Sequence, residues 1–169
     1  MAYIDINDML QRVDITKNFD IKTLNKYIAI SETLDLRQYL SDVFLNDLSK
    51  NYETKAEYIK LLNGGEYTCG NDLKKFEGMK AALVFFVYSR IISTSTIKVT
   101  QTGVVQKESD YSSVASDKAI VRQSNEFEAI AKAYMMDCID YLRSTTLVSY
   151  LNNSIVQNRT VKKFNIIGD

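Results

Sequence analysis

The sequence of 169 residues contains no histidine. Histidine is the commonest general base and the commonest neutral metal ligand in proteins, so its absence argues against triad-type enzymes and against zinc sites. Only two cysteines are present, Cys69 and Cys138, which are too few for a disulfide scaffold and too far apart for a CxxC motif. We expect both to be reduced, buried thiols. The composition therefore predicts no catalytic residue, no cofactor and no metal site, and only an enzyme that uses lysine or carboxylates remains open.

Charge of one sign is also lacking, because 21 lysines and arginines balance 21 aspartates and glutamates. No overall field attracts nucleic acid or an anionic membrane, while a near-zero net charge permits close association between copies. The longest apolar run, 81–88, is much shorter than the roughly 20 residues that cross a bilayer. The start MAYIDINDML lacks the basic residues and apolar stretch of a secretory leader, so we expect an intracellular protein with no membrane partner.

The chain has no proline and only six glycines, so its helices can run long. The length is that of one domain, since single cores usually serve about 100 to 200 residues. The spacing of apolar residues predicts helices over 21–31, 34–48 and 58–62, the first of them capped by Asp20. Residues 1–18 predict an arm or a short helix.

A glycine-containing stretch over 63–71 predicts a loop. Asp72 follows it at a position suited to an N-cap, which predicts a helix that runs from there to Ile92. This helix is apolar nearly all round over 81–88. We therefore expect it to lie at the centre of the core.

β-favouring residues on both sides of Gly103 interrupt the helical pattern over 94–113. This segment predicts a β-hairpin or an extended two-stranded arm. An isolated hairpin is marginally stable in water, so we expect the arm to contact a partner.

After the arm, apolar residues in steps of four and three predict one long helix over 117–151. At about 1.5 Å per residue this helix is roughly 50 Å long. A compact domain of this size has a diameter of about 40 Å, so the subunit is expected to be elongated. Three apolar residues lie off the predicted seam and would form a second apolar surface: Met135, Met136 and Ile139. The seam itself contains Phe127, Ala131, Tyr134, Cys138, Tyr141, Thr145 and Val148.

Several patterns suggest binding chemistry, but each has a simpler structural explanation. Gly65 and Gly70 are spaced as in a phosphate-binding loop, but the lysine and the serine or threonine of that motif are missing, so we interpret the segment as a turn. Asp137 and Asp140 share one face of a helix, as a metal pair requires, although a solvated face is the simpler interpretation. The seam tyrosines would be core residues and not a binding platform.

Basic residues form two further candidate surfaces. Lys74, Lys75 and Lys80 give a basic edge to the predicted central helix, which supports the alternative hypothesis of a small helical nucleic-acid-binding or regulatory module. The tail over 158–169 is the better candidate, because it combines basic and apolar residues in a terminal β-type segment, which suits docking on a protein at least as well as on DNA.

The order of these segments resembles a known family. Two helices containing IAISETLDLRQYLSDVFLNDL precede a glycine-containing loop, a core helix GMKAALVFFVYSRII, an extended arm VTQTGVVQKESDYSS and a long helix EFEAIAKAYMMDCIDYL. Over about residues 20–151 this pattern is similar to that of the head-to-tail connector, or neck adaptor, proteins of tailed bacteriophages. The phrase TGVVQKESDYSS is similar to the arm of such adaptors.

The resemblance implies a mainly α fold: a helical bundle with a long C-terminal helix and an inserted β-hairpin arm. It implies a structural virion protein and not an enzyme. Usually twelve copies form a ring below the portal protein, extend the DNA channel and provide the platform for further neck or tail proteins. Packaged DNA would pass through the channel without sequence-specific binding. The protein would lie in the virion neck, and in the host cytoplasm during assembly.

By this resemblance the chain divides into an N-terminal arm (1–19), a helical connector domain (20–157) that includes the β-arm (94–113), and a C-terminal docking tail (158–169). The β-arm would bridge neighbouring subunits, and the tail would reach the portal. The residues expected at these partner interfaces are Lys98, Val99, Val105, Lys107, Arg159, Val161, Lys162, Lys163 and Phe164.

Overall fold

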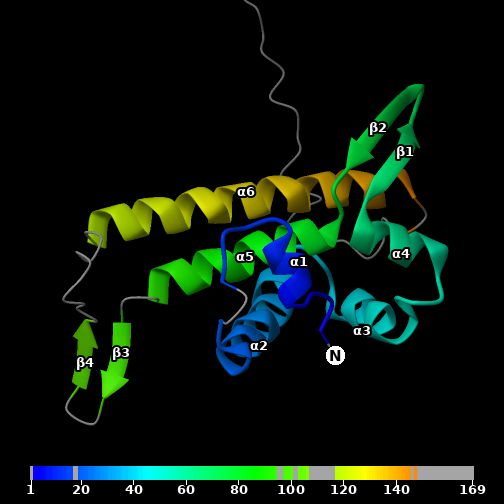
Figure 1. The fold of residues 1–169 in the computed structure, drawn as a ribbon. Coiled ribbons are helices and arrows are strands. Elements are labelled where there is room, and N and C mark those ends of the chain that lie inside the picture. Colours follow the sequence, from blue (N-terminus) through cyan, green and yellow to red (C-terminus); the bar gives the residue numbers. More distant parts are fainter. Residues whose placement is uncertain are drawn as a thin grey trace, which may run out of the picture.

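The computed structural model describes most of the chain as a mainly α-helical molecule with a long C-terminal helix, which confirms the predicted fold class (Figure 1). Helices α5 (Met79–Thr94) and α6 (Asp117–Ser144) lie side by side along the length of the molecule. The described residues are 2–16, 19–94, 97–100, 103–106, 117–145 and 147.

Four shorter helices precede this pair: α1 (Ile6–Leu10), α2 (Ile21–Ile30), α3 (Asp42–Asn51) and α4 (Ala56–Asn63). Asp20 caps α2 as predicted, because its carboxylate accepts hydrogen bonds from the backbone N–H groups of the first turn. Helix α4 confirms the predicted short helix.

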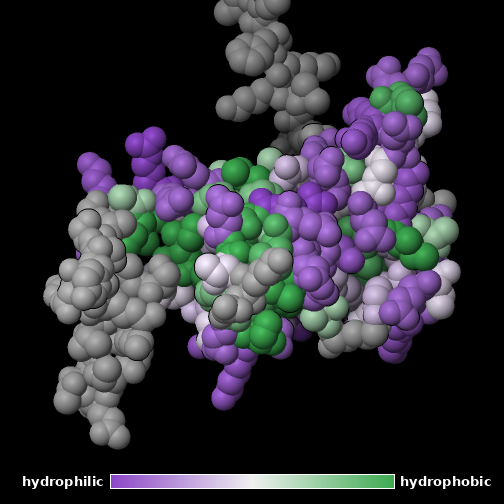
Figure 2. All heavy atoms as spheres, in the orientation of Figure 1, coloured by the Kyte–Doolittle hydropathy of each residue, from purple (hydrophilic) through white to green (hydrophobic). Residues whose placement is uncertain are grey.

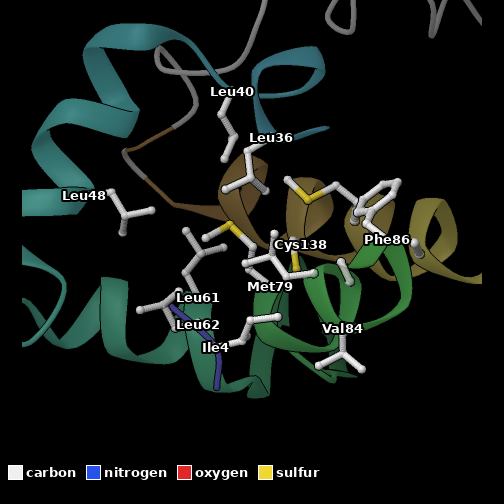
Figure 3. Packing of buried hydrophobic residues seen from close by; sticks show 14 of the residues in the cluster. Ile4, Leu36, Leu40, Leu48, Leu61, Leu62, Met79, Val84, Phe86 and Cys138 are labelled. Atoms are coloured by element: carbon white, nitrogen blue, oxygen red, sulfur yellow. The ribbon is translucent and has the colours of Figure 1, made fainter. Parts of the chain in front are cut away.

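Helix α5 lies at the centre of the core, as its all-round apolar sequence predicts. Nine of its 16 residues are buried. Helix α6 packs along one side of it, while α1, α2 and α4 contact it elsewhere. Figure 3 shows Met79, Val84 and Phe86 of α5 among Leu36, Leu61, Leu62 and Cys138 from other elements.

The predicted continuous helix over 34–48 is wrong. Helix α2 continues into one turn of π-helix (Ser31–Asp35) and a short 3₁₀ turn (Leu36–Gln38), after which the chain bends and α3 begins. Ser41 caps α3, since its Oγ accepts a hydrogen bond from the N–H of Phe44 at 3.3 Å. The apolar spacing alone predicts one helix over 34–48. Because Ser41 is a good N-cap, a new helix begins there instead.

The segment over 63–78 also differs from the prediction. In place of a loop and a helix capped by Asp72, it forms an antiparallel hairpin of β1 (Gly65–Cys69) and β2 (Asp72–Phe76). Gly70, with φ +63°, opens the two-residue turn, as the first central position of a type II′ turn requires. Leu73, which would lie on the buried face of a helix, is instead 70% exposed.

The hairpin β1–β2 packs on the C-terminal end of α6 through aromatic rings. Phe76 stacks on Tyr141 with ring centroids 4.7 Å apart, and Tyr67 meets the same ring edge-on at 5.4 Å. Tyr141 is therefore a core residue, as expected for the seam.

Helix α6 is shorter than predicted and is buried over a wider stripe. It contains 28 residues, or about 42 Å at 1.5 Å per residue, and ends at Ser144. Met135 and Ile139, placed off the seam by their spacing, are completely buried. The expected second apolar surface is wrong at these two residues, because α4, β1 and β2 pack on α6 as well as α5.

The N-terminal segment contains a short helix, α1, and packs on the body of the molecule. Ile4 and Met9 are buried in the common core. The Tyr88 hydroxyl donates a hydrogen bond to the carbonyl of Asp14 at 3.0 Å. Within the described part of the chain, no helix is long and apolar enough to cross a membrane.

Two glycines close the base of the hairpin β1–β2, and we predict that Gly78→Ala lowers the free energy of unfolding by about 3 kcal/mol. Gly78 has φ +83°, and a Cβ there would lie 2.5 Å from the carbonyl oxygen of Leu62 and would also clash with the backbone of Gly64. Gly70→Ala is the matched control, since nothing lies within 4 Å of its Cβ position and only the strained φ remains, at about 1 kcal/mol. Urea unfolding followed by circular dichroism measures both, and equal losses would contradict this account.

The cysteines differ in exposure, which corrects the expectation that both are buried. Cys69 is exposed at the end of β1, whereas Cys138 is buried in α6 and its burial raises the pKa of its thiol. A soluble disulfide reagent should therefore modify Cys69 rapidly and Cys138 only after unfolding. Cys69→Ser should abolish the fast phase; rapid modification that persists in this variant would show that Cys138 is accessible.

Candidate functional site

The predicted arm is a β-hairpin between α5 and α6. Strands β3 (Ile97–Thr100) and β4 (Gly103–Gln106) are antiparallel, with Lys98 paired to Val105 and Val99 to Val104 in the register. Figure 1 shows this hairpin beyond the end of α5, away from the shorter helices.

Within the described residues, neither outer edge of the β3–β4 hairpin has a strand partner. Among the described strands, β3 and β4 pair only with each other. The outward N–H and C=O groups of such a pair are a template for pairing with another chain. Three of the predicted interface residues, Lys98, Val99 and Val105, belong to these strands. The others lie outside the described residues: Lys107, Arg159, Val161, Lys162, Lys163 and Phe164.

The arm leaves the molecule from a stem, which consists of the last turns of α5 (88–94) and the first half of α6 (117–127). Polar contacts that the sequence did not predict hold this stem. Arg90, in the last turns of α5, binds Asp35 of the π-helix through two hydrogen bonds, at 2.6 Å and 3.2 Å. Four residues later a 2.6 Å hydrogen bond joins Thr94 to the hydroxyl of Tyr27 on α2. These bonds fix the end of α5 against α2. The sequence carries little indication of the Arg90–Asp35 pair, because two residues 55 positions apart form no recognisable spacing pattern.

Within the stem, the first half of α6 is joined to the last turns of α5. Ser124 Oγ donates a hydrogen bond to the carbonyl of Ser89 at 3.1 Å, and both serines are buried. The ring of Phe127 lies edge-on to that of Tyr88, with centroids 4.8 Å apart. The two helices that flank the arm are therefore fastened to each other close to the point where it leaves the body.

The predicted basic edge on one helix is wrong, because its residues lie on two elements. Lys74 and Lys75 belong to β2, and Lys80 belongs to α5. Lys80 Nζ lies 3.8 Å from a carboxylate oxygen of Asp8, and Lys75 Nζ lies 3.9 Å from one of Glu77. These carboxylates offset part of the positive charge that would attract phosphate.

A hollow of about 520 Å³ lies beside the N-terminal segment. Asp5, Asp8, Glu53 and Lys80 line it together with apolar side chains. The pKa of Asp5 is lowered, chiefly by the hydrogen bond from the N–H of Asp8 at 3.0 Å. Asp5 caps α1, and the ion pair of Asp8 with Lys80 links α1 to α5.

The acidic pair on α6, Asp137 and Asp140, is at least partly exposed to solvent. Asp140 forms an ion pair with Arg143 at 3.2 Å. Desolvation and then the nearby charge of Asp140 raise the pKa of Asp137, which is exposed. No cluster of three metal-ligating side chains occurs among the residues that the structure describes.

The remaining candidates are also structural. Gly65 and Gly70 belong to the β1–β2 hairpin, which agrees with the interpretation as a turn. Tyr134 is partly buried, with its ring centroid 5.6 Å from that of Phe85. The β3–β4 hairpin and its stem are therefore the arrangement most suited to binding a partner.

We predict that Arg90→Met lowers the free energy of unfolding by about 2–3 kcal/mol, because it leaves the carboxylate of Asp35, 4% exposed, without its partner. This range is reduced for the side chain of Arg90, which is 35% exposed. Arg122→Met is the control: its pair with Glu126 lies on the surface and contributes about 0.5 kcal/mol or less. Urea unfolding of both variants measures the difference, and a loss at position 90 no larger than that at 122 would show that the stem pair contributes little.

Comparison with known proteins gives one result. The model of a family of unknown function (DUF6712) matches residues 36–158, which include α3 to α6 and the β3–β4 hairpin. No curated protein and no solved structure matches the chain. Because the match extends over most of the sequence, the chain belongs to this family of unknown function (DUF6712).

Proposed function

We propose that the protein is a structural virion protein, a subunit of the ring that connects the head and tail of a tailed bacteriophage below the portal. The observation that carries this proposal is the open-edged β3–β4 hairpin on a fastened stem. Two strands alone are marginal in water, so the hairpin gains its stability when another chain covers it. A neighbouring copy in a ring meets this need.

Each part of the molecule has a role in such a ring. The α5–α6 pair forms the body, the β3–β4 hairpin bridges subunits, and the tail over 158–169 docks on the portal. Balanced charge allows copies to pack closely around a channel through which DNA passes without sequence-specific binding. The exposed ends of the ring provide the platform for further neck or tail proteins.

The first experiment is affinity purification of the tagged protein from its native source, with mass spectrometry of the proteins that accompany it. Portal and tail proteins are expected in the eluate. Nucleic acid or host regulators without virion proteins would overturn the proposal and favour the small nucleic-acid-binding or regulatory module. Duplex DNA binding by the isolated protein that falls steeply with salt would support that alternative.

The role of the hairpin has its own test. Replacing residues 97–106 with a flexible Gly/Ser linker of the same length should abolish ring formation and the recovery of portal protein. The melting temperature should change little, since two described strands that pair only with each other contribute little stability of their own. Val43→Ser is the matched control, because it removes an exposed apolar side chain, 69% exposed, from α3. Normal assembly of the linker variant, observed by electron microscopy, would refute the bridging role.

A further inference from the structure

A groove of about 560 Å³ lies between β1, α4 and the end of α6, on the part of the molecule opposite the β3–β4 hairpin. Glu57 and Lys60 of α4, Glu66 and Thr68 of β1, and Tyr141 and Thr145 near the end of α6 are among the residues that line it. It is lined by polar and apolar groups and is open to solvent.

The strand beside this groove has an unpaired edge. Within the described residues, β1 is hydrogen-bonded to β2 alone, and its other edge has no strand partner. Tyr67 and Thr68, adjacent residues that point to opposite faces of β1, both line the groove. The groove therefore opens onto the edge itself. An extended peptide that lies in such a groove adds a strand to the sheet through main-chain hydrogen bonds.

The chain supplies a candidate for that strand. Thr145 lines the groove, and Leu147, the last described residue, is buried two positions later in the sequence. Twenty-two residues follow, 148–169. The eleven residues 148–158 span up to about 35 Å when extended, which is ample for a return to β1. The segment after them, 159–167, has the sequence RTVKKFNII.

Charge and hydrophobicity of this segment match the groove. Glu57 and Glu66 of its lining are exposed, and the segment carries three cations. Lys60, the one cation among the described residues that line the groove, lies with its Nζ 5.9 Å from the ring centroid of Tyr141. The exposed Leu73 and the rings that line the groove offer apolar contacts. β-branched and aromatic residues of the segment favour the strand conformation.

We propose that residues 159–167 add to β1 as a third strand of the β1–β2 sheet in the free subunit. The tail then covers an edge that would otherwise invite pairing between copies. This inference does not depend on the connector ring. If the tail also docks on the portal, docking must first release it from the groove, so the two sites compete for one segment.

The test uses the full chain. Hydrogen exchange measures the amides of β1 in the wild type and in Val161→Pro/Lys162→Pro. Successive N–H groups of a strand point to opposite edges, so the double variant removes a donor toward β1 in either register. The outer-edge amides of β1 should exchange at least tenfold faster in this variant. The matched control, Ile155→Pro/Val156→Pro, changes only the connecting segment and should exchange as the wild type does.

A labelled peptide of residues 158–169 gives the second measurement. It should bind the double proline variant, whose groove is vacant, at least tenfold more tightly than the wild type. Reversing the groove charge with Glu57→Lys/Glu66→Lys in that variant should weaken binding tenfold or more, whereas Glu53→Lys/Glu126→Lys should not. Equal exchange in wild type and proline variant, or no peptide binding, would overturn the proposal. Protection that rises with protein concentration would assign the groove to a second copy's tail and overturn the assignment to the same chain. No portal protein is present, so neither result depends on the connector proposal.

Discussion

The burial of α5 on all sides is the constraint on which the rest of the structure depends. A helix whose surface is apolar nearly all round has no polar face that can be exposed to water, so other elements must surround it. Helix α6 covers one side along its length, and α1, α2 and α4 cover the others. Even the N-terminal segment takes part, because Ile4 and Met9 belong to the same core. The mixed polar and apolar surface that Figure 2 shows is what these enclosing elements leave outside.

This enclosure also determines where an arm can leave the molecule. The connection between α5 and α6 holds the β3–β4 hairpin, so the hairpin starts where the central helix emerges from its cover. At that point polar contacts add to the apolar packing, with Arg90 on Asp35 and Ser124 on Ser89. These bonds hold the ends of both helices in a defined direction. A surface presented on such a stem loses less freedom on binding than one on a loose loop.

Helical periodicity predicted the mainly α fold and the central position of α5, and the β-favouring composition of 94–113 predicted the hairpin in the arm. Periodicity failed at 63–78, where Leu73, Phe76 and Met79 follow helical spacing although the first two lie in a strand. The information that overrides the spacing is in the backbone: Gly64 and Gly78 both have φ +83° and approach too closely for a side chain. Such a contact joins residues distant in sequence, so spacing along the chain does not report it.

The sequence predicted where the β3–β4 hairpin lies, but not the side-chain contacts that hold the helices beside it. The composition of 94–113 indicates strands, and the register of β3 and β4 agrees. The pair of Asp35 with Arg90 depends on a π-helical turn that places a carboxylate beside α5, and no local pattern indicates that turn. The same limit applies to the width of the stripe on α6. Met135 and Ile139 are buried because β1, β2 and α4 also cover that helix. The sequence did not predict the β1–β2 hairpin, so it could not predict this cover.

The two hairpins show why one is part of the core and the other is suited to a partner. Each has two antiparallel strands joined by a short connection. The β1–β2 hairpin brings Tyr67 and Phe76 onto the ring of Tyr141, and aromatic contacts of this kind contribute about 0.5–1.5 kcal/mol each beyond area burial. The strand sequences IKVT and GVVQ contain no aromatic residue. The β1–β2 hairpin is thus stabilised within the chain by these aromatic contacts, whereas a two-stranded unit without such contacts is marginal in water.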